Sequence, residues 1–413
     1  MIKLKRVAVA VAALGMISAQ AAEVEVLHWW TSGGEAKSAA ELKKMIEAKG
    51  DKWKDFAVAG GGGENAMTVL KSRVVSGKAP TAAQVKGPSI QEWGAEGTLA
   101  SLDSVAKAGE WDKLLPGVVA NVMKYKGSYV AVPVNVHRVN WMWVNPEVFK
   151  QAGAEVPKTW ADFPAAAEKI QKAGFIAVAH GGQPWQDFTV FESVVLGVGG
   201  AKFYDDALVK LDQKALTSPT MEKAFDTFRT VRKYVDKDAA NRDWNLATAM
   251  IINGKAAMQF MGDWAKGEFT AAGKVPGKDY LCLAAPGTDK SFTFNIDSFI
   301  VFKQSGADAA KGQADFANAV MSPEFQEVFN LNKGSIPVRS GVKMDKFDDC
   351  AKLSAKDFAD TAKTGGLVPS IAHQMAVPAA TTGAIQDVVT AFFNSNESSK
   401  DAVKKLASAA KTK

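Results

Sequence analysis

The sequence predicts an α/β protein made of two lobes, and three observations support this fold class. Strand-like and helix-like segments alternate along most of the 413 residues. From residue 126 the alternation resumes with new sequence, without an internal repeat or a low-complexity linker. The length suits two domains of ordinary size. Two α/β lobes joined by more than one crossing of the chain therefore explain the pattern.

The N-terminus has the order of a secretory signal. Basic MIKLKR is followed by apolar VAVAVAALGMI and by the small residues of Ala19-Gln20-Ala21. This order predicts a signal peptide at residues 1–21 rather than a structural helix. No cysteine lies at the cleavage point, and no later apolar run reaches the roughly 18 residues that span a membrane. We expect a soluble periplasmic protein without a lipid anchor.

The first half predicts a β-α-β-α-β order. Residues 24–30 (VEVLHWW) form the first predicted strand, and apolar spacing predicts a helix over 35–49 that ends at Gly50. A strand at 55–59, a helix from Met67 to Gly77, a strand at 81–85 and a short helix over 88–97 follow. This order implies a mostly parallel sheet covered by helices.

The second half continues the alternation. Residues 126–145 predict a turn and two extended runs broken near Pro133, and 160–174 predict a helix with a glycine stop. Further strands are expected at 175–182, 281–286 and 291–303. Ligands of open α/β sheets bind beyond the carboxyl ends of strands. The candidate residues at or near such ends are Trp29, Trp30, Lys86, His180 and Asp297.

Charge and motifs argue against several classes of function. Removing Lys3, Lys5 and Arg6 with the signal lowers the net charge from +6 to 6 − 3 = +3, too little to indicate nucleic acid or an anionic membrane. The motifs of phosphate loops, serine hydrolases and zinc proteases are absent. The glycine-rich turn at 59–66 is expected to allow a strand to approach a helix at a cleft edge. No metal or cofactor is expected, because the four histidines (His28, His137, His180 and His373) lack ligand spacing.

Only two cysteines are present, Cys282 and Cys350. Their spacing excludes a compact zinc site, and an exported protein favours a disulfide between them. Two separate buried thiols are the alternative.

Eleven tryptophans suggest a sugar site. The apolar faces of a sugar ring pack on indoles, while its hydroxyl groups need donors and acceptors nearby. Tryptophans where the chain turns are candidates for this role: Trp29, Trp30, Trp185, Trp244 and Trp264. Others are assigned to the core: Trp93, Trp111, Trp141, Trp143 and Trp160. A glycosidase using Glu35 and Asp297 is the alternative, although a pair chosen among 44 acidic residues has little specificity.

Several stretches resemble the sugar-binding components of bacterial ABC importers, above all the periplasmic glucose- and glucose/mannose-binding proteins. They are VEVLHWWTSGGE (24–35), residues 126–153, TWADF (159–163), INGKAAMQFMGDW (252–264) and GSIPVR (334–339). The resemblance covers essentially the whole mature chain. It implies a periplasmic-binding-protein type II fold with three hinge crossings and a ligand cleft between the lobes.

The resemblance also implies lobe boundaries and binding residues. One lobe would hold 24–133 and 298–340, the other 136–290 and 347–413, with crossings at 134–135, 291–297 and 341–346. The implied ligand-binding residues are Trp29, Trp30, Glu35, Lys86, Trp244, Trp264, Asp297, Lys333 and His373. Five others have no clear counterpart in the family and are expected only at the cleft edge: His28, His137, Arg138, His180 and Trp185.

The expected function is therefore to bind a monosaccharide, glucose, and to deliver it to a membrane permease without catalysis. We expect a monomer whose lobes close on the sugar. A binding protein that serves mainly a chemoreceptor is a further alternative, since it would share the site and differ only in its partner.

Overall fold

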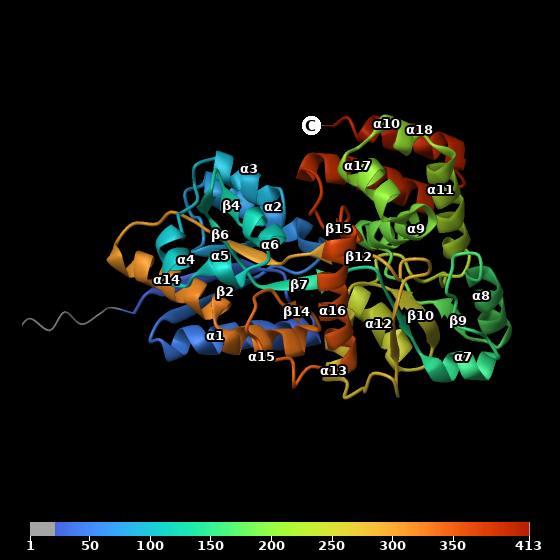
Figure 1. The fold of residues 1–413 in the computed structure, drawn as a ribbon, viewed down its shortest axis with the longest axis horizontal. Helices are drawn as coiled ribbons and strands as arrows, with labels where there is room; N and C mark the ends of the chain where they lie inside the picture. The colour runs from blue at the N-terminus through green and yellow to red at the C-terminus, as the bar shows by residue number, and fades with distance from the viewer. Residues whose placement is uncertain (1–20, 413) are drawn as a thin grey trace, which may run out of the picture.

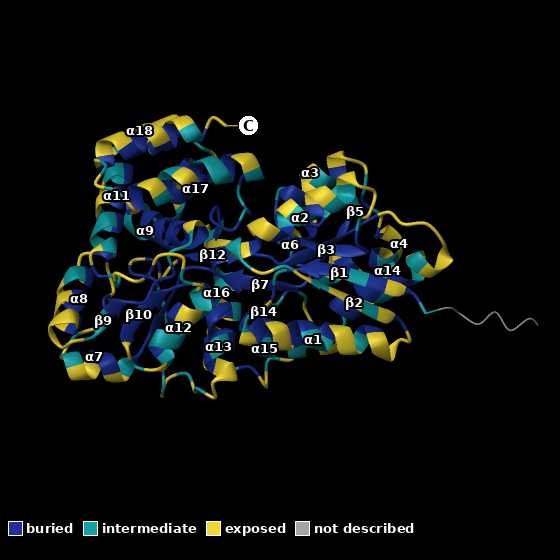
Figure 2. Cartoon of the chain, turned by 180° about the vertical axis from the view of Figure 1, so that it is seen from behind, coloured by how far each residue is buried: buried dark blue, intermediate teal, exposed yellow. Residues whose placement is uncertain are grey.

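A computed structural model describes residues 21–412 of the chain. Figure 1 shows two lobes side by side, each a sheet with helices packed around it. Strands are largely buried, whereas the outer faces of the helices are exposed (Figure 2). The predicted signal peptide lies outside the described residues, apart from Ala21. Within 21–412, no helix combines the length and apolar character that crossing a membrane requires.

The sheet of the first lobe has five strands in the order β2-β1-β3-β13-β6. The strands are β1 (Glu23–His28), β2 (Lys52–Ala57), β3 (Ala82–Val85), β6 (Ala131–Pro133) and β13 (Ser298–Val301). β1 runs parallel to β2 and β3, as the sequence predicts. β13 returns from late in the sequence and is antiparallel to both β3 and β6.

Several strand boundaries differ from the prediction, and the strand expected at 291–303 is interrupted, so that only its second part forms β13. β2 begins at Lys52 rather than residue 55, because it pairs with β1 from Glu23 onward as an edge strand with exposed polar side chains. β1 ends at His28, so Trp29 and Trp30 follow the strand instead of closing it. This places both indoles in the connection between β1 and the next helix.

Helices and a small hairpin cover this sheet. They are α1 (Gly33–Ala48), η1 (Gly61–Gly63), α2 (Glu64–Val75), α3 (Ser89–Ala95), α4 (Asp103–Ala108), α5 (Trp111–Leu114), α6 (Gly117–Val122), β4 (Lys124–Tyr125), β5 (Ser128–Tyr129), α14 (Ala307–Met321) and α15 (Pro323–Lys333). α1 packs against α15 beneath the sheet (Figure 1). Val26, Leu42, Phe299 and Phe329 are part of the resulting core.

The sheet of the second lobe is mixed, with strand order β11-β8-β10-β9. Its strands are β8 (Trp141–Val144), β9 (Ile176–Val178), β10 (Ala256–Phe260) and β11 (Leu281–Ala284). β8 is antiparallel to both of its neighbours, and only β9 and β10 run parallel.

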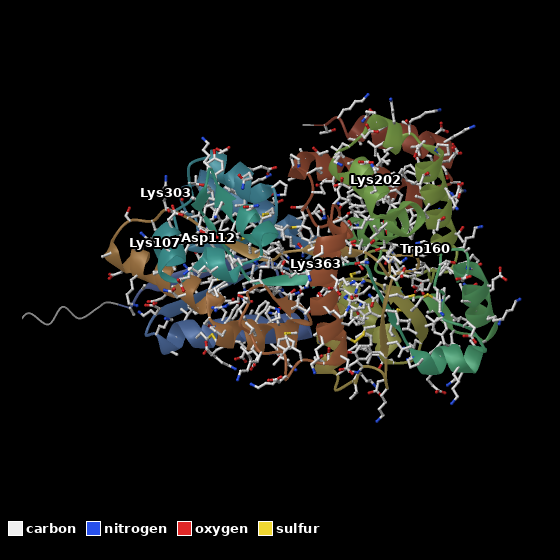
Figure 3. The ribbon with its side chains drawn as sticks, viewed as in Figure 1. Lys107, Asp112, Trp160, Lys202, Lys303 and Lys363 are labelled. Atoms are coloured by element: carbon white, nitrogen blue, oxygen red, sulfur yellow. A yellow bond between two sulfur atoms is a disulfide. The ribbon has the colours of Figure 1, made fainter. Side chains whose placement is uncertain are left out.

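The second lobe is rich in helices. They are α7 (Pro146–Ala152), α8 (Phe163–Lys172), α9 (Pro184–Tyr204), η2 (Asp205–Val209), α10 (Gln213–Leu216), α11 (Pro219–Arg232), α12 (Trp244–Ile252), α13 (Ala265–Ala271), α16 (Asp349–Thr364), α17 (Ala379–Phe393) and α18 (Ser399–Ala409). Exposed lysines extend from both lobes, among them Lys107 and Lys303 on the first and Lys202 and Lys363 on the second (Figure 3).

A third sheet lies between the lobes, in the order β14-β7-β12-β15. Its strands are β7 (Asn135–Arg138), β12 (Phe292–Asn295), β14 (Ile336–Pro337) and β15 (Leu367–Pro369). β7 connects β6 of the first lobe to β8 of the second, and β12 leads directly into β13. The chain therefore passes between the lobes through this sheet.

The predicted disulfide is confirmed. Cys282 in β11 is bonded to Cys350 in the first turn of α16. Four of the five tryptophans assigned to the core are buried, namely Trp111, Trp141, Trp143 and Trp160. Trp93 is half-buried against the first core and packs edge-on to Phe302.

Candidate functional site

A cavity of about 300 Å³ lies between the lobes. It is lined by all nine residues that the sequence analysis predicted as ligand contacts, namely Trp29, Trp30, Glu35, Lys86, Trp244, Trp264, Asp297, Lys333 and His373. These residues come from elements far apart in the sequence. The fold thus gathers them in one place, and both lobes contribute to its walls.

The two adjacent tryptophans have different environments. Trp30 is buried, with its ring edge-on to Phe299 at 5.4 Å between centroids and tilted against Phe329 at 5.0 Å. Its indole Nε1 is buried without a hydrogen-bond partner among residues 21–412. Trp29 is half-buried, and Nζ of Lys86 lies 5.1 Å from its ring centroid. One indole therefore forms the floor of the cavity while the other offers an accessible face.

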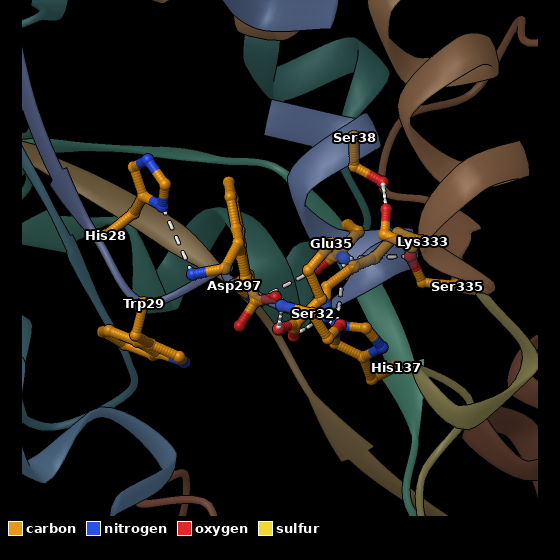
Figure 4. Close-up of polar contacts among 12 residues, drawn as sticks. His28, Trp29, Ser32, Glu35, Ser38, His137, Asp297, Lys333 and Ser335 are labelled. Carbon is orange, nitrogen blue, oxygen red and sulfur yellow. Dashed lines mark hydrogen bonds and ion pairs between the residues drawn. The ribbon is translucent and has the colours of Figure 1, made fainter. Parts of the chain in front are cut away.

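The pair Glu35–Lys333 joins two helix ends. Glu35 lies in the first turn of α1, where the helix dipole favours a negative charge, and Lys333 ends α15, where it favours a positive one. Nζ of Lys333 donates to Oε1 of Glu35 over 2.6 Å, and both side chains are almost fully buried. Figure 4 shows the two side chains pointing toward one another beside Ser32. The pairing neutralises two charges that would be costly to bury separately.

A second group of charges surrounds Asp297, which follows β12. Nε2 of His137 donates to its Oδ2 over 2.9 Å, and Nζ of Lys86 lies 3.8 Å from its Oδ1. The other ring nitrogen of His137 is hydrogen-bonded to Asp263. Figure 4 shows His137 and Asp297 together at this side of the site.

Burial and charge set the protonation of these groups. Burial disfavours the charged forms of both His137 and Asp297. For His137, the nearby carboxylates of Asp263 and Asp297 outweigh burial and raise its pKa. In turn His137 and Lys86 overcome burial and hold the pKa of Asp297 well below its usual range. Burial lowers the pKa of Lys86, although Asp297 opposes the shift. Asp297 is therefore an ionised acceptor, and His137 holds its proton more tightly than a free histidine does.

His373 is different, because it remains a neutral imidazole. Burial, with the nearby positive charges of Lys86 and His137, lowers its pKa well below the ordinary value. Its Nε2 lies 3.1 Å from Oγ1 of Thr189. The ring lies 4.8 Å from that of Trp264, with which it forms an aromatic wall on the second lobe.

The glycine-rich turn closes one side of the cavity. Gly60, Gly61, Gly62 and Gly63 all have positive φ angles, a backbone conformation that residues other than glycine rarely adopt. A Cβ on Gly62 would lie 3.1 Å from the indole of Trp185, and one on Gly63 would lie 3.0 Å from that of Trp29. The turn is at the cleft edge as expected, and its glycines allow close approach to the indole of Trp29 and to that of Trp185 in the first turn of helix α9.

The cleft-edge candidates divide into two groups. His137 and Trp185 line the cavity, whereas His28, Arg138 and His180 do not. Neighbouring residues of a strand point to opposite faces, so Arg138 turns away from His137 and donates to Asp357 instead. His28 pairs with Asp55 on the neighbouring β2, and His180 with Asp187 on α9.

Sequence reasoning missed several polar residues of the lining: Thr31, Ser32, Gln183, Asp243, Asn245 and Asn295. Most of them lie within two residues of Trp30, Trp185 or Trp244 in the sequence, and this proximity could have identified them as lining residues. Asn295 lies directly across from His137 in the strand pairing and two residues before Asp297. Within residues 21–412, no cluster of three or more histidine, cysteine or acidic side chains is arranged to hold a metal ion.

Comparison with known proteins identifies the family. Residues 33–327 match the family model for bacterial extracellular solute-binding proteins. The chain belongs to this family. It is 50% identical over 403 residues to a probable sugar-binding periplasmic protein of Rhizobium meliloti, a match that covers 97% of each chain. Like this relative, it is a periplasmic protein.

More distant proteins are also similar to this chain. The glucose-binding protein GlcS of Saccharolobus solfataricus is 24% identical over 249 residues, which cover 57% of this chain and 45% of GlcS. Among solved structures, the bacterial solute receptor AcbH, described as having an exclusive preference for β-D-galactopyranose, superposes with a TM-score of 0.78 at 20% identity. That match covers 94% of this chain and 98% of AcbH, and it confirms the predicted two-lobed type II fold.

Proposed function

We propose that this solute-binding protein captures one neutral sugar ring, glucose, between its lobes and delivers it to an ABC importer in the membrane. The observation that carries the proposal is a small cavity in which indoles stand beside buried, mutually neutralised ions. A sugar offers what this lining can use, because its C–H faces pack on aromatic rings and its hydroxyl groups both donate and accept.

The charge balance favours an uncharged ligand. Three cations (Lys86, Lys333 and His137) are matched by three carboxylates (Glu35, Asp263 and Asp297). One further carboxylate, that of Asp243, is part of the lining. An anionic solute would meet no unmatched cation within this set. A neutral polyol would gain charge-assisted hydrogen bonds without disturbing the pairs.

The size of the cavity favours a monosaccharide. Small-molecule sites commonly range from about 300 to 1,000 Å³, and this cavity is at the lower end. The names of two distant relatives, GlcS for glucose and AcbH for a galactopyranose, agree with a single ring.

We further propose that the sheet between the lobes acts as the hinge. The proposed lobes are 24–133 with 298–340, and 136–290 with 347–413. Away from the cavity they touch at Gln386 and Glu64, whose side chains are 2.7 Å apart, and at Ala379, whose N–H donates to Glu92 over 3.1 Å. Such contacts support a closed arrangement of the lobes, the form that a permease would recognise on a monomeric binding protein.

A glycosidase is less well supported. It needs a carboxylic acid that keeps its proton near neutral pH. The pKa of Asp297 is shifted the other way, and Glu35 is paired with Lys333. The carboxyl group of Glu192 does have a pKa raised by burial, to about 7, but it lies outside the cavity lining.

Calorimetry of the mature protein tests the proposal. Glucose, mannose, galactose, xylose and maltose are titrated in parallel, and glucose is expected to bind most tightly. Trp264→Ala should weaken glucose binding by about 1–3 kcal/mol through lost packing, while Trp93→Ala, on α3 away from the cavity, should not. Absence of heat with every monosaccharide would refute the proposal, and cleavage of an aryl glucoside would favour the enzyme.

A further inference from the structure

Glu192 is a buried carboxyl that the proposed binding reaction does not use. It lies in α9 with no exposed surface, and no lysine, arginine or histidine among residues 21–412 approaches within ion-pair distance. Three donors contact it instead: the hydroxyl of Tyr204 at 2.8 Å, Oγ of Ser370 at 2.6 Å and the N–H of Ala372 at 3.2 Å. A carboxyl buried without a cation is costly, so these contacts need an explanation.

The donors all hold one short segment, Ser370–His373. Two come from the segment itself, and the third, Tyr204, accepts a hydrogen bond from the N–H of Ile371 over 3.1 Å. Ser370 links Glu192 to His373, because its Oγ donates to Glu192 and accepts from the N–H of His373 over 3.1 Å. Glu192 therefore lies at the centre of a network that fixes the backbone leading to His373.

This segment carries His373 into the cavity. Thr189, one turn before Glu192 on the same helix, contacts Nε2 of the ring. The next residue, Gln374, places its carbonyl against Gly87 of the first lobe, so closely that a Cβ there would lie 2.2 Å from the oxygen. The segment thus presents a cavity residue and meets the opposite lobe beside Lys86.

We propose that Glu192 is a positioning residue for sugar binding: by holding Ser370–His373 it sets the imidazole of His373 against Trp264. This inference rests on the proposed function, in which His373 contacts the sugar. Glu192 itself touches no ligand.

A double-mutant cycle tests the proposal. Glucose affinity is measured for wild type, Glu192→Ala, His373→Ala and the double variant. Glu192→Ala should raise Kd about tenfold alone but less than about twofold when His373 is already alanine, because coupled residues are not additive. Glu192→Gln should restore binding to within about threefold of wild type, since its amide oxygen can still accept from Tyr204 and Ala372. As a control, Glu192→Ala combined with Trp29→Ala should be additive.

Two further measurements keep the result decisive. If Glu192→Ala does not fold, Ser370→Ala replaces it in the cycle, because it removes one donor to Glu192 and the acceptor for the N–H of His373. The ring signals of His373 are also followed by NMR without sugar and should shift in Glu192→Ala. This arm reports on Glu192 even if wild type binds no monosaccharide. Unchanged ring signals, or a lower melting temperature with wild-type Kd and an additive cycle, would overturn the proposal.

Discussion

Nε2 of His137 lies 2.9 Å from Oδ2 of Asp297, and this contact connects the strand between the lobes with the turn after β12. His137 is also hydrogen-bonded to Asp263, the residue before Trp264. One imidazole therefore links an anionic acceptor of the cavity to the segment that carries Trp264. Because it is buried, the link is not screened by salt as a surface pair would be.

Replacing the acceptor in this link should weaken binding. Asp297→Asn leaves His137 and Lys86 without their shared counter-ion and removes the charge-assisted hydrogen bond that we propose Asp297 makes to the sugar. Such bonds contribute about 1.5–3 kcal/mol, so Kd for glucose should rise roughly 10- to 100-fold by calorimetry at pH 7. Asp55→Asn, which alters the pair with His28 outside the cavity, serves as the control. Equal affinities of the two variants would argue against a role for Asp297.

Lobe closure can be blocked at Gly87. An alanine there would place its Cβ 2.2 Å from the carbonyl of Gln374 on the other lobe, at a φ of +46°. Gly87→Ala should raise Kd and reduce the decrease in radius of gyration that we expect from saturating glucose in small-angle scattering. Gly77→Ala is the matched control, because its φ is +72° but nothing lies within 4 Å. If both variants compact as wild type does, the contact at Gly87 does not limit closure.

The disulfide should affect stability far more than affinity. Cys282 and Cys350 are separated by 68 residues, and opening a loop of that size costs about 4 kcal/mol in the chain-entropy model. The double variant Cys282→Ser/Cys350→Ser should lose about this much free energy of unfolding in urea while Kd for glucose stays within twofold. Denatured, unreduced wild type should show no free thiol, and finding two would contradict the bridge.

Glu192 should make stability depend on pH. Burial raises its pKa from 4.5 to about 7, so the folded protein holds this proton more tightly than the unfolded chain. The stabilisation is complete below pH 4.5 and is lost as pH rises through 7. The loss in free energy of unfolding amounts to about 3 kcal/mol. Tyr204, the titratable neighbour, stays neutral because burial raises its pKa well above the ordinary value.

Urea unfolding of wild type and Glu192→Gln between pH 4 and 8.5 measures this effect. The contributions of most other titrating groups cancel in the difference between the two free energies of unfolding. Wild type should lose stability relative to the variant as pH rises. A constant difference, or one of opposite sign, would show that the carboxyl is not shifted in this direction.

The parts of the site that could be predicted from the sequence obey short-range rules. Lys86 directly follows β3 and Asp297 closely follows β12, so their approach to one cleft follows from the way open sheets present the ends of their strands. The role of His137 could not be derived in this way, because its partners Asp263 and Asp297 are 126 and 160 residues away. β2 was misplaced because an exposed edge strand lacks the apolar signal of a buried one.

Glu192 is an intermediate case. An acidic residue within the apolar run FTVFESVVLG is a visible anomaly, and the helix around it is buried on nearly every side. The sequence could therefore have marked Glu192 as unusual. Its partners in Ser370–His373 depend on the packing of β15 against α9, which no local pattern reveals.

The strand order of the first lobe has a consequence for export. β13 lies between β3 and β6 in the sheet, yet its residues are synthesised and exported long after those of both neighbours. A chain that has emerged only as far as residue 297 leaves the edge of β3 open and β6 without its partner, and Cys350 follows later still. Such open edges invite pairing with other chains. The N-terminal lobe therefore cannot finish folding until β13, α14 and α15 have emerged, and the emerging chain stays vulnerable to aggregation until most of it has crossed the membrane.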